Sequence, residues 1–257
     1  MLAALALGSA WAGTSGSGAP TYSADSIANS AAGIAGFYAP NTFLSIYGQN
    51  LSRVTKSMTP DDIQAGMLPT ALIGTGVRVL INNIPAIIWY VSPTLVNVLV
   101  PTLLIAGPAT IQLEADGLAG PPVMITLTDT APTLFQIDAA TVLGVHLDGS
   151  EITADAPAHA GEIVALFATG LGPTLPAQIP DMIAQSAAQI SARADFQVLL
   201  NGSPVDPSRI LYVGVAPGCA GVYQINLLLP DDAPPSPEIR LSTSDQVSPP
   251  GRVLPLQ

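Results

Sequence analysis

The chain has 257 residues, of which 49% are apolar and only 10% charged, and its formal net charge is −11. An average soluble domain has roughly 25% charged residues, so uncharged polar residues, glycine and proline must cover much of this surface. The seven basic residues, with Lys56 the only lysine, exclude the clustered positive charge that nucleic acids and anionic membranes require. The length suits one large or two small domains.

The chain begins with a short apolar segment that is typical of a signal peptide. Residues 1–12 end in Ala10-Trp11-Ala12, which matches the small-x-small rule for cleavage, and the segment is too short to span a bilayer. The usual positively charged start is missing, so a frayed apolar terminus is the alternative. Residues 13–38, rich in Gly, Ser and Ala, are predicted to be a linker or weakly ordered arm that Ile27 and Phe37 could attach to the first module.

Two stretches of the chain repeat one pattern. Gly76–Pro101 and Asp195–Pro230 each contain a β-rich run, an Asn-containing turn, a proline, an aromatic-bearing strand and an Asn-centred strand closed by a proline. Asn201-Gly202 suits a two-residue hairpin turn in which both residues have positive φ, and Asn82-Asn83 suits it less comfortably. A repeat of this length indicates two similar modules.

Further strands are predicted in the same order in each module. Asn41–Leu51 has its counterpart in Glu162–Leu171, and short apolar runs of this kind are typical of strands buried in a β-sandwich. The alternation of VMITLT places Val123, Ile125 and Leu127 on one face of a strand.

The Pro-bearing segment Asp129–Phe135 is the predicted boundary, so the modules span residues 39–130 and 131–257. Module two is expected to end with a strand at Glu238–Ser242. The tail that follows is expected to be poorly ordered, because its prolines at 249, 250 and 255 limit strand pairing.

With both copies in view, the chain resembles an uncharacterised C-terminal domain that recurs in secreted proteins of acidobacteria. The motifs that carry the resemblance are FATGLGP (167–173), LLNGSP (199–204), YVGVAPGCAGVYQINLLLP (212–230) and LPTALIGTGVRVLINNIPAIIWYVSP (68–93). Each half also resembles the IPT/TIG type of immunoglobulin-like module. The resemblance covers about residues 39–241 and implies the fold and export, but no site residues. One departure is that module one reads TLVNVLVP where module two reads YQINLLLP.

Few residues could carry catalysis. His146 and His159 are the only histidines, no G-x-S-x-G motif surrounds a serine, and solvent-facing turn residues are the simpler interpretation of both histidines. Two distant histidines and the single cysteine, Cys219, fall short of a zinc site, and Cys219 is expected to be a half-buried filler. Glu151 and Asp155 could form a carboxylate pair only if a cleft brought them together. The sequence therefore predicts neither an enzyme nor a bound cofactor or metal.

The aromatic residues of the repeated strands are the candidate ligand contacts: Trp89, Tyr90, Tyr212 and Tyr223. An exposed ring could stack on a sugar, although such rings more often fill cores and interfaces. Trp89 and Tyr90 are adjacent, so they are expected to point to opposite faces of a strand, and at most one of them would serve the core. The copies differ at Trp89 and at Tyr223-Gln224, where specific binding should be sought.

The sequence thus predicts an all-β protein made of two tandem immunoglobulin-like β-sandwich domains. We expect a non-catalytic, exported protein that acts as a structural, adhesive or protein-interaction module, located extracellularly, at the cell surface or in the periplasm. The alternative is a carbohydrate-binding module that uses exposed aromatics. The expected partner is accordingly a protein or polysaccharide, not nucleic acid, and no membrane span is expected in the mature chain.

Overall fold

The computed structural model describes residues 18–244 and 246–257, so the predicted signal peptide lies outside the described residues. The chain divides into two compact units. Unit 1 runs to Asp129 and includes Pro180–Ile183, and unit 2 comprises Thr130–Ile179 and Ala184–Gln257. The division after Asp129 lies one residue before the predicted boundary.

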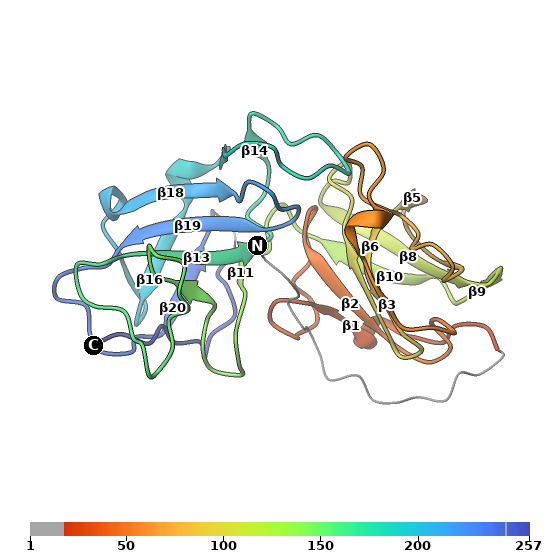
Figure 1. Ribbon diagram of the computed structural model, residues 1–257, viewed down its shortest axis with the longest axis horizontal. Coiled ribbons are helices and arrows are strands. Elements are labelled where there is room, and N and C mark those ends of the chain that lie inside the picture. Colours follow the sequence, from red (N-terminus) through yellow and green to blue (C-terminus); the bar gives the residue numbers. More distant parts are fainter. Residues whose placement is uncertain (1–17, 245) are drawn as a thin grey trace. The chain divides into compact units, whose positions relative to one another are not determined.

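Unit 1 is built from two antiparallel sheets (Figure 1). The first has the order β1 (Ile27–Asn29), β2 (Phe43–Tyr47), β7 (Leu95–Leu99), β6 (Ile87–Val91) and β3 (Lys56–Ser57). The second has the order β10 (Val123–Leu127), β8 (Gly107–Ala115), β4 (Val77–Ile81) and β5 (Ile84–Pro85), with β9 (Leu118–Ala119) paired to β8. Two 3₁₀ turns, η1 (Ala24–Ser26) and η2 (Pro60–Asp62), lie in the connections.

The core of unit 1 lies between these sheets. Leu44 and Val98 of the first sheet and Val79 and Ile111 of the second belong to one buried cluster. The predicted alternation in β10 is confirmed, because Val123, Ile125 and Leu127 are buried whereas Met124 is 68% exposed. Unit 1 is therefore a β-sandwich.

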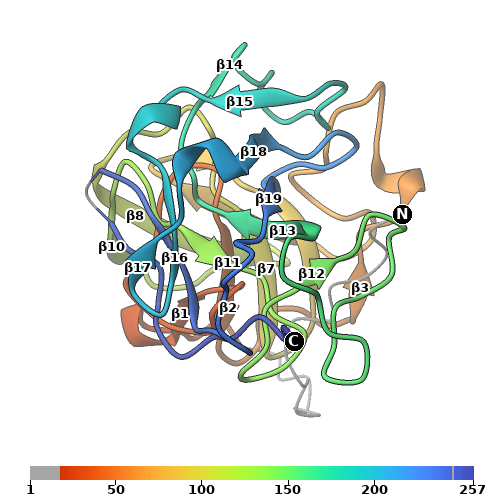
Figure 2. The ribbon, with the colours of Figure 1, turned by 90° about the vertical axis from the view of Figure 1, so that its left-hand side faces the viewer.

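Unit 2 has one large and one small sheet (Figure 2). The large sheet has the order β11 (Thr133–Leu134), β13 (Ile163–Thr169), β19 (Tyr223–Leu228), β18 (Ile210–Val215), β15 (Ala188–Ile190) and β14 (Thr174–Leu175), with β12 (Gly144–Val145) paired to β13. The small sheet has the order β17 (Ser203–Pro204), β16 (Gln197–Leu200) and β20 (Ile239–Ser242). The 3₁₀ turns are η3 (Arg193–Asp195) and η4 (Pro207–Arg209). Side chains of both sheets, among them Leu166, Ile225, Val198 and Leu241, form one buried cluster.

The repeat predicted from the sequence is present in the hairpin turns of both units. Asn82 and Asn83 have φ values of 49° and 62°, and Asn201 and Gly202 have 48° and 80°, as a type I′ turn requires. The first Asn of each turn also joins the hairpin to a neighbouring strand. The Oδ1 of Asn82 accepts from Thr110 N at 2.8 Å, and that of Asn201 accepts from Glu238 N at 2.9 Å. Each Asn also donates its backbone N–H to the carbonyl of the same partner.

A β-bulge recurs in the aromatic-bearing strand of each unit. Tyr90 lies opposite Asn97 and Tyr212 lies opposite Asn226, and the register shifts just before each tyrosine. The extra residue is Trp89 in β6 and its counterpart in β18 is Leu211. Because a bulge interrupts the pleat, the predicted strict alternation of Trp89 and Tyr90 does not hold there, and both side chains are half-buried.

Two predictions about the ends of the chain are wrong. Residues 18–38 do not form a loose arm, because β1 pairs with β2, Ile27 is fully buried in the core, and the Tyr38 hydroxyl donates to the Ile27 carbonyl. The C-terminal tail is also packed, with Leu254 and Leu256 buried in the core of unit 2. Its prolines limit strand pairing but leave the intervening leucines free to pack.

The predicted all-β class and tandem β-sandwich architecture are confirmed. Within the described residues, regular helical structure is limited to four 3₁₀ turns. No helix in that part of the chain has the length and hydrophobicity needed to cross a membrane.

One buried ion pair fixes the long connection between β3 and β4. Lys56 Nζ lies 2.7 Å from Asp62 Oδ1, and the Asp62 side chain is 1% exposed. Asp62 Oδ2 accepts from the backbone N and the hydroxyl of Thr59 at 3.0 and 2.9 Å. The hydrogen bond from Lys56 is the main cause that lowers the pKa of Asp62 to about 2.

We predict that Asn201→Ala lowers the free energy of unfolding by about 1–2 kcal/mol, because it removes the acceptor for Glu238 N and puts a less suitable residue at positive φ. Asn201→Gly loses only the acceptor and should cost less. Urea unfolding of both variants tests this order, and Asn82→Ala and Asn82→Gly should repeat it in unit 1. Equal stabilities of Asn201→Ala and the parent protein would contradict the role of the turn.

We also predict that Asp62 makes the protein acid-sensitive. A carboxyl whose folded pKa is depressed stabilises the fold above its unfolded value, and this contribution is lost as the pH falls from about 4 to about 2. At neutral pH, Lys56→Met should cost about 2 kcal/mol or more, because it leaves a buried carboxylate without its cation.

The control is Arg53→Gln, which breaks the exposed pair between Arg53 and Asp116 and should cost well under about 1 kcal/mol. Chemical denaturation at pH 7 and at about pH 3 measures both variants. If Lys56→Met and Arg53→Gln were equally mild at neutral pH, the structural importance of the buried pair would be refuted.

Candidate functional site

The four candidate aromatics do not form an exposed row. Tyr223 is fully buried in the core of unit 2, and its hydroxyl donates to the Gly172 carbonyl, so its prediction as a ligand contact is wrong. Tyr223 lies on the side of β19 that faces the core, and the sequence alone did not show which side that would be. Trp89 is half-buried and packs edge-on against Phe43, with ring centroids 5.3 Å apart. Tyr90 and Tyr212 are also half-buried.

The large sheet of unit 2 has a face that is turned away from its core. On β13 and β19, Val164, Leu166, Ile225 and Leu227 are fully buried, and the residues that alternate with them are half-buried. The register places these residues in cross-strand rows. We define the outer face by the following residues: Ile163, Ala165, Phe167, Leu211, Tyr212, Gln224, Asn226 and Leu228. Figure 1 shows β13, β19 and β18 side by side.

The corresponding face of unit 1 is different. Leu95, Leu99 and Phe43 occupy the positions of Gln224, Leu228 and Ile163, and each is at most 6% exposed. The outer face of unit 2 instead remains accessible, and its Leu211 is 50% exposed. The two copies of the repeat therefore share a scaffold but differ in the surface that it presents.

Tyr212 lies along the outer face over a glycine. Its hydroxyl donates to Val215 O at 2.8 Å and lies 3.3 Å from Ala188 O. A Cβ atom on Gly214 would lie 2.6 Å from this hydroxyl, so the ring extends along β18 across the position where a side chain would stand. Two strand residues span about 6.6 Å, which is close to the reach of a tyrosine side chain. Gly214 thus allows the ring to lie against the sheet.

Two amides stand beside this ring on β19. Asn226 is the cross-strand partner of Tyr212, and Gln224 is that of Gly214. The Gln224 Nε2 donates to Asn226 Oδ1 at 2.7 Å, which orients the pair. A flat ring with neighbouring amides can contact apolar groups and exchange hydrogen bonds at once. The difference between the two copies pointed to Tyr223-Gln224, of which only Gln224 lies on the outer face, and Phe167 and Asn226 were missed as surface residues because only the register shows which face is open.

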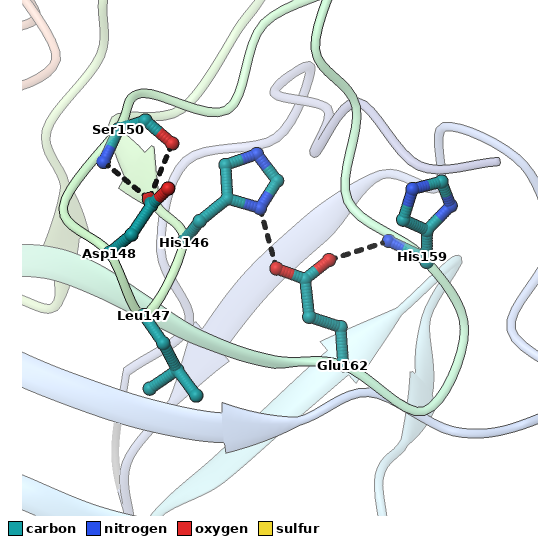
Figure 3. Close-up of a pocket in the computed structure, with 6 residues that line it drawn as sticks. All are labelled: His146, Leu147, Asp148, Ser150, His159 and Glu162. Carbon is teal, nitrogen blue, oxygen red and sulfur yellow. Dashed lines mark hydrogen bonds and ion pairs between the residues drawn. The ribbon is translucent and has the colours of Figure 1, made fainter.

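The two histidines lie together at another part of unit 2, in a shallow depression of about 460 Å³ (Figure 3). His146 follows β12, and Glu162 immediately precedes β13. His146 Nδ1 lies 2.5 Å from Glu162 Oε1, and Glu162 Oε2 accepts from the backbone N of His159 at 2.9 Å. The His159 residue is exposed, as predicted for a turn, whereas His146 is half-buried and engaged.

Both ring nitrogens of His146 face hydrogen-bond acceptors. Nδ1 faces the Glu162 carboxylate and Nε2 lies 3.2 Å from the Ala156 carbonyl oxygen. Neither oxygen can donate, so both bonds form only when the ring carries two protons. The hydrogen bond with Glu162 accordingly raises the pKa of His146. Burial opposes ionisation of Glu162, but its bonds with His146 and His159 lower its pKa overall.

This cluster brings a serine, histidines and carboxylates together, yet it lacks the geometry of a hydrolase. The Ser150 hydroxyl donates to Asp148 Oδ1 at 2.6 Å, and Figure 3 shows this pair turned away from His146. A serine nucleophile needs a base with a free lone pair, and His146 has none in this arrangement. Ser150 and its backbone N bind Asp148 tightly enough to lower the pKa of that carboxyl. The arrangement ties loops together and supplies no activated nucleophile.

The described residues also give no support for a metal site or a reactive thiol. In that part of the chain, no three His, Cys, Asp or Glu side chains gather as metal ligands would. Cys219 is half-buried, as predicted, and burial raises the pKa of its thiol, which disfavours the reactive thiolate.

Comparison with known proteins leaves the family open. No family model and no curated protein matches the chain. Among solved structures, a mixed-linkage glucan utilisation locus SGBP-B of Bacteroides ovatus, solved with a heptasaccharide, aligns with 15% identity and a TM-score of 0.32 over 86% of this chain and 40% of that one. The surface glycan-binding protein PbSGBP-B of Prevotella bryantii aligns with 14% identity and a TM-score of 0.28 over 90% and 41%.

The Ig1-2 module of the Drosophila receptor protein tyrosine phosphatase DLAR aligns with 11% identity and a TM-score of 0.21 over 93% of this chain and 95% of that one. The chain thus spans about two fifths of the length of the two glycan-binding proteins.

We predict that Ser150 is inert toward a fluorophosphonate probe at about pH 8, because its hydroxyl proton is directed at Asp148 and no base accepts it. Intact-mass spectrometry measures labelling, with chymotrypsin as the positive control. Labelling of Ser150 that His146→Gln abolishes would show that a nucleophile and base do pair here.

Proposed function

We propose that this chain is an exported, non-catalytic module of the cell surface or periplasm that binds a protein partner through the outer face of unit 2. The observation that carries the proposal is this accessible, uncharged face. At three of its positions unit 1 has a buried side chain instead (Phe43, Leu95 and Leu99), although Tyr47, at the position of Phe167, is 41% exposed there. A module of this kind would act as an adhesive or as a spacer between domains.

The composition of the outer face supports a protein partner. Its apolar residues are Ile163, Phe167, Leu211 and Leu228, and its polar groups are the tyrosine and the two amides. Interface cores are depleted in charged residues and enriched in aromatic and other apolar side chains, which exclude water around a few hydrogen bonds. The partner surface would be apolar and uncharged with hydrogen-bonding groups at its centre.

Tyr212 favours a second candidate function, the binding of a polysaccharide. Its ring lies along the sheet beside Gln224 and Asn226, and a pyranose has an apolar C–H face and hydroxyl groups at its edges. Stacking on the ring together with hydrogen bonds to the amides would match both features. Of the other aromatics named from the sequence, Tyr223 is buried and Trp89 packs on Phe43, and Tyr90 has no counterpart of Gln224 beside it, because unit 1 has Leu95 at that position.

We predict that a photocrosslinking residue at position 211 captures one discrete protein from an envelope extract of the producing organism. The control is the same residue at Met124, which is exposed on β10 of unit 1. Binding of the purified partner should weaken about tenfold or more in Asn226→Ala, because Asn226 lies in the middle cross-strand row of the face, between Ala165 and Tyr212. Equal capture from positions 211 and 124, or unchanged affinity of the variant, would contradict the proposed interface.

The polysaccharide candidate makes a separate prediction. Affinity electrophoresis in a panel of soluble glycans should show retardation that Tyr212→Ala abolishes, since the stacking ring is removed. Tyr90→Ala is the matched control, because Tyr90 occupies the same place opposite Asn97 in unit 1. Absence of retardation at millimolar saccharide would eliminate this candidate and leave the protein interface to stand alone.

A further inference from the structure

The histidine cluster has a property that the proposed binding function does not use. The two acceptors around His146 stand on different segments, Glu162 immediately before β13 and Ala156 in the loop that precedes it. A doubly protonated ring can donate to both at once. A neutral ring keeps one proton, so one nitrogen would direct a lone pair at an oxygen and that contact would fail.

We propose that this cluster is a pH-sensitive clasp: the protonated His146 ring holds residues 153–157 against the start of β13, and loss of its proton releases that loop. The carboxylate is the stronger acceptor, because a charged partner roughly doubles the strength of a hydrogen bond. The remaining proton therefore stays on Nδ1, which faces Glu162, and the contact that breaks is the one between Nε2 and Ala156.

The released segment is bounded on both sides. Ile152 and Ala158 are fully buried in the core of unit 2, and Ala158 is also held by backbone hydrogen bonds with Pro255 and Gln257. Between them, the backbone N of Thr153 donates to Ala156 O and the backbone N of Ala156 donates to Thr153 Oγ1. Only these two hydrogen bonds of the turn are independent of His146. Opening is therefore confined to this loop and leaves the sheets intact.

Charged groups stand on each segment beside the clasp. Asp231, which is paired with Arg209, lies next to Gly161. Asp148 and Glu151 stand on the loop that carries His146, Asp155 and His159 stand on the following loop, and Glu162 precedes β13. The negative charge of Asp148 adds to that of Glu162 in favouring the imidazolium, while burial opposes it. The cluster has more acidic than basic groups, so the surroundings favour the closed state.

The direction of the pH response follows from these shifts. The pKa of His146 is raised above its usual 6.5, so the clasp contributes its full stability below that value and loses it as the pH rises through the folded pKa. The pKa of Glu162 is lowered, so the carboxylate stays charged through the mildly acidic range. The clasp is closed at mildly acidic pH and opens as the pH rises through the folded pKa of His146.

Nuclear magnetic resonance of the 257-residue protein tests this directly. The His146 ring should titrate with a midpoint above that of histidine in a short unstructured peptide, about 6.5. In Glu162→Gln the His146 midpoint should fall toward the peptide value. A His146 midpoint at or below the peptide value in the parent protein would overturn the proposal, and this measurement requires no variant to fold.

Hydrogen exchange tests the release of the loop. After correction for intrinsic rates, the hydrogen-bonded amides of Thr153 and Ala156 should exchange about fivefold faster at about pH 9 than at about pH 6, as expected for the loss of one net hydrogen bond. His146→Gln should abolish this difference, and His159→Gln should preserve it. A pH-independent exchange rate in the parent protein, or a change spread evenly over the core strands, would refute a local clasp.

Discussion

The pairing of an aromatic-bearing strand with an Asn-centred strand is the interaction on which both units depend. In unit 1 it joins β6 to β7 and in unit 2 it joins β18 to β19, and each pair contains the same bulge before a tyrosine. The alternate side of these strands supplies the core, through Ile88 and Val98 in one copy and Val213 and Ile225 in the other. A bulge adds one residue to one strand, so it fixes the register of the pair and bends the strand locally. The remaining strands of the same sheet pair outward from this centre in each unit.

The sequence predicted this scaffold well because local chemistry determines it. Asn at positive φ, prolines after the turns and period-two alternation each require a particular backbone, and the repeat showed them twice. The burial of Ile27 and Leu254 was not predictable in the same way. Their neighbours are Gly, Ser and Pro, which are typical of linkers, and only contacts with distant strands hold them in the core. The composition of a segment indicates only its local conformational preference, whereas its burial depends on which distant strands pack against it.

The site could be predicted only in part for the same reason. Tyr212 and Tyr223 lie close in sequence and are chemically alike, yet one lies on the outer face and the other fills the core. The difference is one of register, and a one-residue change of register exchanges the faces of a strand. The position of Tyr212 further depends on Gly214, which gives its ring room against the sheet. His146 and Glu162 are 16 residues apart and meet because β12 pairs with β13, which places the end of one beside the start of the other.

A chain with 10% charged residues cannot rely on a uniformly charged surface, so the position of each charge matters more than usual. Two ion pairs hold loops that connect the strands. Lys56 and Asp62 fix the segment between β3 and β4, and His146 and Glu162 fix the loops before β13. Strands are held by backbone hydrogen bonds that do not titrate, whereas these connections are held by ionisable side chains. Asp62 takes up a proton only in strong acid, because Lys56 holds its pKa at about 2, whereas the pKa of His146 is raised from 6.5, so the two connections respond in different parts of the pH scale. The uncharged outer face of unit 2 contains none of these groups, so the binding proposed for it would not depend on them.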